Sequence, residues 1–397
     1  MSKSNETTPN VPTLRFRQFR DDWSIKRLSD IAEVVGGGTP DTTDSTLWNG
    51  DIQWFTPTEV GHSKYVSSSI RTISQLGLKK SSAKKLPAGS ILLSSRATVG
   101  ECSIAQRDCT TNQGFQNLIP KKSVYNEFLY YLTQTKKRHF VKYASGSTFL
   151  EISNSEIKKA ICAIPDIEEQ TEIATFLSAI DMRIEVQNKI IEDLKILKKE
   201  LCNRHFKVIY NDTSLEYVTL KDILTERKEY CGKDGTYTHG TLSKEGVSPK
   251  TERYDRDFLV KSEDKQYKVT HFNDICYNPA NLKFGVICRN TFGDLIFSPI
   301  YITFEISKEF YPAYIELFLT NANFLGRIRR YEQGTVYERM AVSPEDFLSY
   351  ETRMPAYEEQ VKFADEIQRI QEKIELETSF LNSLQKQRKY LLNAMFI

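Results

Sequence analysis

The sequence predicts a mixed α/β (α+β) protein with two similar globular blocks and two long helices. The blocks are expected to contain twisted sheets, and the helices to form an antiparallel coiled coil about a pseudo-two-fold axis. Three observations support this prediction. The 397-residue chain repeats a helical stretch at an offset of 190 positions. Each copy carries an apolar heptad seam, and each follows a block of short apolar runs separated by turn signals. So long a period describes a whole domain with its helix, present twice.

The repeated stretch begins at Pro165 and Pro355 and ends at Phe206 and Phe396, and the two copies align without a gap. Acidic residues follow each proline, and no later proline or glycine interrupts either copy, which is typical of a helix. Apolar residues recur with heptad spacing over about four heptads, as in a coiled coil. Two amphipathic helices on unrelated cores are the simpler alternative, but they leave unexplained why both seams carry polar residues at the same two positions.

Antiparallel pairing would also determine which seam residues face one another. The seam is interrupted by Gln187 and Lys198 in the first helix and by Glu377 and Arg388 in the second. Lys198 opposite Glu377, with Gln187 opposite Arg388, pairs polar seam residues with polar ones, apart from His205, which would face Ile370 near the end. A shift of one heptad would place Lys198 and Arg388 against isoleucines. We therefore expect these four residues to set the register, with about 1 kcal/mol or less from each partly exposed pair.

The predicted layout is a polar tail (1–20), a first block (21–164), a long helix (165–210), a second block (211–354) and a second long helix (355–397). In the first block, WSIKRLSDIAEV is a short helix or a strand running into one. Short apolar runs such as GSILLSSRATVGECSIA are expected strands, and NEFLYYLTQTKKRHFVKYA is an expected helix. The second block repeats this plan loosely. YVTLKDILTER is the counterpart of SIKRLSDIAEV, and FNDICYNPANLKFGVICRN is the counterpart of GSILLSSRATVGECSIA.

The composition is that of an ordinary soluble protein. Hydrophobic residues make up 40% of the chain, and no apolar run approaches the ~18 residues of a membrane span. The N-terminal MSKSNETTPN has no apolar core, so we expect no secretory signal. Seven cysteines without a CxxC pair favour free thiols in a reducing cytoplasm.

The net charge of +2 does not by itself indicate a nucleic-acid partner. Residues 21–164 carry 18 Lys and Arg against 13 Asp and Glu, a balance of +5. Residues 212–354 carry 19 against 22, a balance of −3. A DNA-binding face on the second block would therefore depend on local clustering of basic residues.

Motifs for catalysis are weak. The glycines at positions 36–38 lead into TPDTTD rather than a helix, and the NPA at 278–280 lacks the second proline and the aromatic residue of an amino-methyltransferase motif. Asp166 and Asp193 would lie ~40 Å apart on one helix, too far to share a metal ion. No GxxxxGK[ST] motif occurs, and the five histidines are scattered singly. We expect a chain without catalytic residues, metal or cofactor of its own.

Several motifs together resemble the specificity subunit of a type I restriction–modification enzyme. They are LRFRQFRDDWSIKRLSDI, GSILLSSRATVG with TNQGF, and the two P-x-x-EEQ helix starts. The resemblance covers nearly the whole chain and implies that each block is a target-recognition domain for one half of a split double-stranded DNA site. The second block departs from the pattern, because NPANLKFG replaces SSRATVG and TNQGF is absent.

The resemblance also implies partners and the cofactors that they bind. The two helices would hold the half-sites apart and dock two methyltransferase subunits, and restriction subunits that translocate DNA would join them. S-adenosylmethionine and ATP with magnesium would belong to those partners. The rival hypothesis is a coiled-coil adaptor that separates two protein-binding modules and has no DNA role.

Candidate DNA contacts follow from side-chain chemistry. Arginine binds guanine in a bidentate way, and asparagine or glutamine binds adenine, whereas lysines suit phosphates, which position without specifying. Alternatively, the arginine forms a structural ion pair and the lysines are a solvated face. The candidates are Arg96, Asn112 and Gln113 for bases, Lys79, Lys80, Lys84 and Lys85 for phosphates, and Arg253, Arg256, Asn281, Lys283 and Arg289 in the second block.

Overall fold

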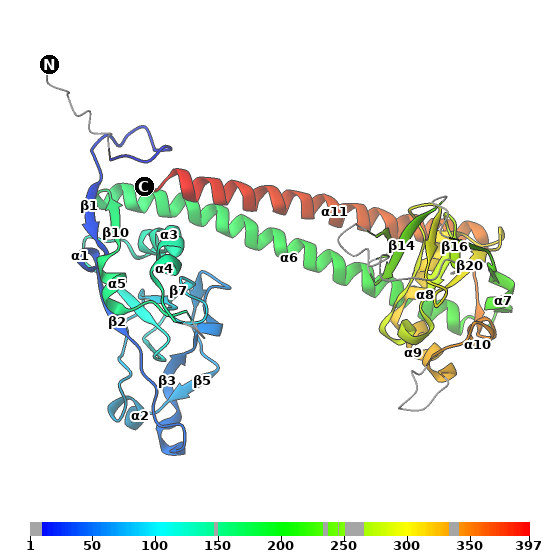
Figure 1. The fold of residues 1–397 in the computed structure, drawn as a ribbon, viewed down its shortest axis with the longest axis horizontal. Helices are drawn as coiled ribbons and strands as arrows, with labels where there is room; N and C mark the ends of the chain where they lie inside the picture. Colours follow the sequence, from blue (N-terminus) through cyan, green and yellow to red (C-terminus); the bar gives the residue numbers. More distant parts are fainter. Residues whose placement is uncertain (1–9, 147–149, 233–236, 245, 251–265, 333–340) are drawn as a thin grey trace. The chain divides into compact units, whose positions relative to one another are not determined.

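The computed structural model contains two compact units, each with one globular block and parts of both long helices (Figure 1). The long helices are α6 (Ile167–Asn211) and α11 (Tyr357–Ala394). Unit 1 comprises Met1–Asn188 with Phe380–Ile397, and unit 2 comprises Lys189–Ser379. The structure describes residues 10–397 apart from 147–149, 233–236, 245, 251–265 and 333–340.

Unit 1 combines small sheets with short helices. Its described strands are β1 (Ser24–Arg27), β2 (Ala32–Gly36), β3 (Trp48–Phe55), β4 (Tyr65–Val66), β5 (Arg71–Ile73), β6 (Ile91–Leu93), β7 (Cys102–Ala105), β8 (Cys109–Thr111), β9 (Gln116–Pro120) and β10 (Ile161–Ile164). Its shorter helices are α1 (Leu28–Ile31), α2 (Gln75–Lys79), α3 (Asn126–Thr135), α4 (Lys137–Tyr143), α5 (Asn154–Lys159), η1 (Ser45–Leu47) and η2 (Pro57–Glu59). The strand orders are β2-β9-β6-β7-β4, β5-β3-β8 and β1-β10.

Unit 2 follows a related plan. Its described strands are β11 (Tyr217–Thr219), β12 (Leu224–Glu226), β13 (Tyr230–Cys231), β14 (Thr238–Ser243), β15 (Gly246–Pro249), β16 (Tyr267–Thr270), β17 (Ile275–Tyr277), β18 (Ile287–Arg289), β19 (Leu295–Phe297), β20 (Ile302–Ile306) and β21 (Glu351–Arg353). Its shorter helices are α7 (Leu220–Ile223), η5 (Pro279–Phe284), α8 (Pro312–Thr320), α9 (Ala322–Ile328), η6 (Arg329–Tyr331) and α10 (Pro344–Leu348). The strand orders are β12-β20-β17-β18, β13-β16-β19-β14-β15 and β11-β21.

Both blocks close by pairing their first strand with their last. β1 pairs antiparallel with β10, which leads into α6 (Figure 1). β11 pairs antiparallel with β21, which leads into α11. The first strand runs directly into a one-turn helix in each block, α1 or α7, so the predicted strand running into a helix is confirmed. Each block is therefore anchored where its own long helix begins.

The glutamine of the P-x-x-EEQ motif attaches each block to its helix. The Gln170 side chain donates to the carbonyl of the motif's proline and accepts from the Tyr125 N–H, both at 2.9 Å. Gln360 makes the same two bonds, to its own proline and from Tyr311, also at 2.9 Å. Both glutamines are buried, and the two tyrosines are the residues before α3 and α8. The motif satisfies a main-chain donor that the start of each helix would otherwise leave unpaired.

The main core of each unit includes one end of each long helix. In unit 1 the Phe396 ring, just after α11, lies 5.2 Å from Phe128 of α3 and 6.3 Å from Trp23. In unit 2 the Phe206 ring of α6 lies 5.5 Å from Tyr314 of α8. Phe206 and Phe396 close the two copies of the repeat, so equivalent residues play equivalent parts in the two cores.

Within each unit the two long helices run antiparallel, as predicted. In unit 2, His205 stacks on Phe363 with 3.6 Å between ring centroids, and the Lys198 ammonium donates to Gln371 at 2.8 Å. The residue numbers thus fall along one helix as they rise along the other. In unit 1 the same direction follows from an Asp181–Arg388 salt bridge and from Arg183, which lies 5.9 Å from the Phe380 ring.

The predicted register is wrong by about one heptad. Lys198 bonds to Gln371 instead of facing Glu377, which forms a salt bridge along its own helix. Arg388 pairs with Asp181 instead of Gln187. The prediction assumed that a charge at a seam position needs a polar residue directly opposite.

Two physical effects favour the observed register. Lysine and arginine have long apolar stems, so their charged ends reach polar groups beside the seam while the stems cover apolar surface. In addition, burial lowers the pKa of His205 to about 4, so a neutral imidazole stacks on Phe363 and its Nε2 lies 2.9 Å from the Tyr314 hydroxyl. His205 thus behaves as an aromatic residue and does not require a polar residue opposite.

Candidate nucleic-acid interface

In the first block, the loop between β6 and β7 is held on both sides by main-chain hydrogen bonds. The Ser95 N–H donates to the Gly114 carbonyl at 2.8 Å, and the Ser95 carbonyl accepts from the Ile152 N–H at 2.9 Å. Ala97 has a φ of +63°, a left-handed conformation that residues with a Cβ rarely adopt. The loop therefore presents Arg96 from a fixed and strained backbone.

Arg96 remains accessible. Its side chain is 47% exposed, and its Nε lies 3.6 Å from a carboxylate oxygen of Glu151, which is exposed to a similar degree. The structural alternative, an ion pair, is thus present. An exposed pair of this kind contributes only about 0–1 kcal/mol, so the pair could open for another ligand of the guanidinium at little cost.

The TNQGF segment lies beside this loop. Asn112 Oδ1 accepts from the Gly114 N–H at 2.9 Å, which leaves the amide N–H groups of Asn112 without a partner among the described residues. Gln113 Oε1 accepts from the Thr39 hydroxyl. A Cβ built on Gly114 would lie 3.7 Å from the Arg96 Cβ. The structure therefore brings together all three predicted base contacts, and it adds Thr39, which sequence reasoning missed.

The glycine run at 36–38 provides close backbone packing. A Cβ on Gly37 would lie 1.8 Å from the Asn112 carbonyl oxygen, and one on Gly38 would lie 2.3 Å from the Ala83 nitrogen. The Gly38 N–H also donates to the Thr111 carbonyl at 2.8 Å. The run thus joins the segment around Asn112 to the residues that precede Lys84.

The four predicted phosphate-binding lysines are exposed and lie on or shortly after α2. Lys85 forms a salt bridge of 2.8 Å with Asp108, with both side chains more than half exposed. The Ser82–Ala83 backbone packs against Gly38, two residues before Lys85. The glycine run therefore connects the lysine segment with the loops that carry Arg96 and Gln113.

In the second block, the loop from β17 to β18 corresponds to the Arg96 loop. Its anchor is similar, because the Val342 N–H donates to the Pro279 carbonyl at 3.4 Å, as Ile152 does to Ser95. Asn281 is exposed and Lys283 half-buried, with the Lys283 ammonium 5.3 Å from the Phe284 ring. The structure places these two candidates on one loop.

Arg289 lies on β18 rather than on that loop. Its guanidinium donates to Glu316 at 3.0 Å and to Asn273 at 2.7 Å, and only 18% of its side chain is exposed. These contacts are those of a structural residue. Arg253 and Arg256 lie outside the described residues.

A polar cluster in the second block had no signal in the sequence. Arg227 donates to both carboxylate oxygens of Asp274, at 2.8 and 3.0 Å. The two ring nitrogens of His271 lie 2.8 Å from Asp294 and 3.0 Å from Glu229. Partial burial lowers the pKa of His271, but these hydrogen bonds outweigh it and raise the pKa above its ordinary value. The scattered histidines of the sequence gave no indication of this arrangement.

The described part of the chain contains no group of three or more His, Cys, Asp or Glu side chains arranged to hold a metal ion. Over the same residues, no helix combines the length and the apolar character needed to cross a bilayer.

Comparison with known sequences gives a consistent result. Residues 20–196 match the family model of the type I restriction modification DNA specificity domain. The chain is 40% identical over 204 residues to the MjaIX specificity subunit of Methanocaldococcus jannaschii, covering 48% of this chain and 47% of that protein. It is 27% identical over 188 residues to the EcoR124I/EcoR124II specificity subunit of Escherichia coli, covering 46% and 45%. These two alignments span about half the length of the curated relatives. A 23% match to the putative MjaX specificity subunit of M. jannaschii covers 97% and 95%.

Solved structures share the fold. An S subunit of a type I restriction–modification system from M. genitalium aligns with a TM-score of 0.55 at 15% identity, covering 98% of this chain and 99% of that chain. A chain from a structure on complex assembly and conformational transition of the type I R-M system aligns with a TM-score of 0.59 at 12% identity, covering 94% and 96%. The predicted fold class of mixed α/β blocks with long helices is confirmed.

Proposed function

Because the chain belongs to the family of type I restriction–modification specificity subunits, we propose that it reads a bipartite DNA target, one half-site with each block. The observation that carries this proposal is the shared design of the two reading loops. Each loop joins two paired antiparallel strands, β6 and β7 or β17 and β18, and is anchored by an equivalent main-chain bond, from Ile152 to Ser95 or from Val342 to Pro279. Two related scaffolds with different exposed side chains suit a target with two different halves.

In the first half-site, Arg96 is proposed to bind guanine and Asn112 or Gln113 to bind adenine. The support is their position on adjoining loops, with the Arg96 guanidinium half exposed and the Asn112 amide N–H groups unpaired among the described residues. The lysines around α2 would contact phosphates and fix the position of the block on the duplex. In the second half-site, the candidates on the equivalent loop are Asn281 and Lys283.

The long helices are proposed to dock two methyltransferase subunits, with restriction subunits joining the complex in the cytoplasm. The support is a set of apolar side chains that the helices leave largely exposed. They include Met182, Val186, Ile196 and Leu376, each more than half exposed. Catalysis would belong to the partners, which would bind S-adenosylmethionine and ATP with magnesium, while this chain supplies recognition without chemistry.

The test is a methylation map of cells that carry the chain with its methyltransferase. Replacing residues 21–164 with another recognition block should change one half of the methylated motif, and Arg96→Ala should relax a guanine in that same half. Inserting four residues at 211–214 should change the gap between half-sites and leave their bases unchanged. A swap that altered both halves would contradict independent reading.

The rival function is an adaptor that holds two protein-binding modules apart. Selection from a random DNA pool at moderate salt, with methyltransferase subunits present, separates the two hypotheses. A specificity subunit should enrich one bipartite sequence, whereas an adaptor should enrich none.

A further inference from the structure

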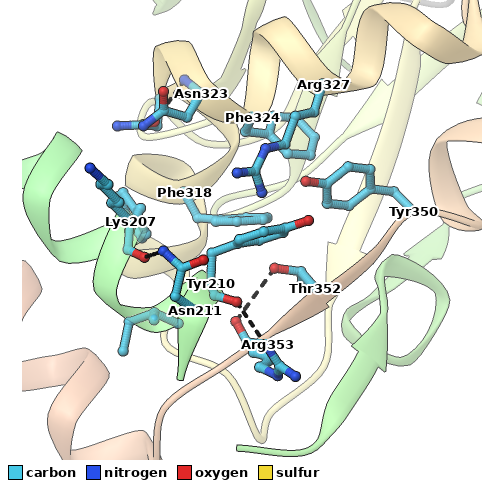
Figure 2. Close-up of a pocket in the computed structure, with 13 residues that line it drawn as sticks. Lys207, Tyr210, Asn211, Phe318, Asn323, Phe324, Arg327, Tyr350, Thr352 and Arg353 are labelled. Atoms are coloured by element: carbon cyan, nitrogen blue, oxygen red, sulfur yellow. Dashed lines mark hydrogen bonds between the residues drawn. The ribbon is translucent and has the colours of Figure 1, made fainter. Parts of the chain in front are cut away.

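A pocket of about 430 Å³ lies in unit 2 at the C-terminal end of α6. No residue of the loop between β17 and β18 lines it. Its walls come from the last turns of α6, from α8 and α9, and from β21 (Figure 2). Pockets of about 300 to 1,000 Å³ are the usual size for small-molecule ligands.

The charge of the lining favours an anion. Lys207, Arg327 and Arg353 line the pocket, and none of the described lining residues is an aspartate or a glutamate. The surrounding block has more acidic than basic residues, so three cations around one cavity differ from its general composition. A concave surface lined by one sign of charge concentrates ions of the opposite sign.

Arg327 is the side chain best placed to bind such an anion. Its guanidinium carbon lies 3.4 Å from the centroid of the Tyr210 ring, and Tyr350 lies on the same side of the pocket (Figure 2). Stacking holds the planar group in one orientation, and a guanidinium has five N–H donors. Among the described residues no salt bridge joins Arg327 to a carboxylate, and its side chain lines the pocket.

The other cations have different parts. Arg353 donates to the carbonyls of Leu215 at 3.1 Å and Tyr210 at 2.8 Å, so it contributes charge while it holds the end of α6 in place. Lys207 and Asn323 are exposed at the rim and supply further donors. A fixed guanidinium with nearby ammonium and amide groups matches the several oxygens of a phosphate better than a single carboxylate.

We propose that this pocket binds a phosphate group. Two sources share this chemistry: a free phosphorylated small molecule, and the backbone of the DNA itself. A nucleotide would also contact Tyr210, a residue of the pocket lining that is 38% exposed.

The experiment is isothermal titration calorimetry of the full chain with inorganic phosphate and with AMP. The wild-type chain should bind saturably with one site. Asn323→Asp, which places a negative charge at the rim, and Arg327→Gln should each weaken binding at least tenfold. Arg330→Gln is the matched control, because Arg330 is an exposed arginine in the same block outside the pocket, and it should bind as the wild type does. Asn323 is exposed, so Asn323→Asp keeps the test valid if Arg327→Gln fails to fold.

A competition arm separates the two sources. If the ligand is a free small molecule, a target-free DNA duplex should not displace AMP, and AMP should bind more tightly than phosphate. If the source is the DNA backbone, the duplex should displace phosphate from the wild type and bind more weakly to Asn323→Asp. Absence of saturable binding to the wild type, or equal binding by Asn323→Asp and the wild type, would overturn the proposal.

Discussion

Replacing Glu169 with alanine should destabilise unit 1 by about 3 kcal/mol. Glu169 is fully buried and accepts from Arg15 through both carboxylate oxygens at 2.7 Å, and from the Trp23 indole at 3.2 Å. Removing it leaves the mostly buried Arg15 without its carboxylate and the indole N–H without an acceptor. Lost charge-assisted bonds cost about 1.5 to 3 kcal/mol and an unpaired buried donor about 1 to 3. The lower part of the combined range applies, because Arg15 is 13% exposed and keeps a bond to the Asp21 carbonyl.

The assay is urea unfolding followed by tryptophan fluorescence. The three tryptophans are Trp23, Trp48 and Trp54, all in unit 1, so the signal reports that unit without contribution from unit 2. With a urea dependence of about 2 to 3 kcal/mol per molar, the Glu169→Ala transition should move down by about 1 M or more.

Glu359 supplies the matched control. It occupies the same position of the repeated motif but is exposed at the start of α11. Glu359→Ala removes a carboxylate from the first turn of a helix, which costs about 0.3 to 1 kcal/mol, and it should leave the tryptophan transition unchanged. A shift below about 0.3 M for Glu169→Ala, or equal shifts for both variants, would refute the argument from burial.

Three further outcomes are expected. Gln371→Ala should destabilise unit 2 by about 1 kcal/mol, because the Lys198 ammonium loses its acceptor and Glu375 loses the donor that Gln371 provides, as measured by urea unfolding followed by circular dichroism. Burial lowers the pKa of His205 to about 4, so its contribution to stability is fully present above the unfolded-state pKa of 6.5 and is lost as pH falls toward 4. The free energy of unfolding, measured at several pH values, should therefore depend less on pH in His205→Phe than in the wild type. Gly38→Ala should destabilise unit 1 by more than 2 kcal/mol, because its Cβ would lie 2.3 Å from a neighbouring backbone nitrogen. Gly36→Ala should destabilise it little, because its Cβ would lie 3.7 Å from a glutamine side chain. Unfolding followed by tryptophan fluorescence measures both changes.

Patterns with a fixed period were read correctly from the sequence. The heptad seam and the offset of 190 residues predicted two long helices, and the first strand of each block leads into its predicted helical turn. These features depend on which face of an element is apolar, which the order of residues shows directly.

The register could not be read in the same way. Lys198 and Arg388 sit at seam positions, but the contacts of their charged ends depend on side-chain length and on the residues beside the opposite seam. The left-handed conformation of Ala97 and the close packing of Gly38 are also invisible to periodicity, because each depends on a backbone segment distant in sequence.

The two units differ in which contacts the repeat has kept. Gln170 and Gln360 make the same bonds, since each satisfies a buried main-chain donor whose loss would cost a full desolvation penalty. At the equivalent seam position, by contrast, Arg388 pairs with a carboxylate and Lys198 with an amide. Partly exposed charge pairs contribute little, so their chemistry can change without loss of the fold. By the same reasoning, exposed loop residues such as Arg96 are the least constrained by folding, which leaves the reading loops free to differ between the two blocks while their anchors remain alike.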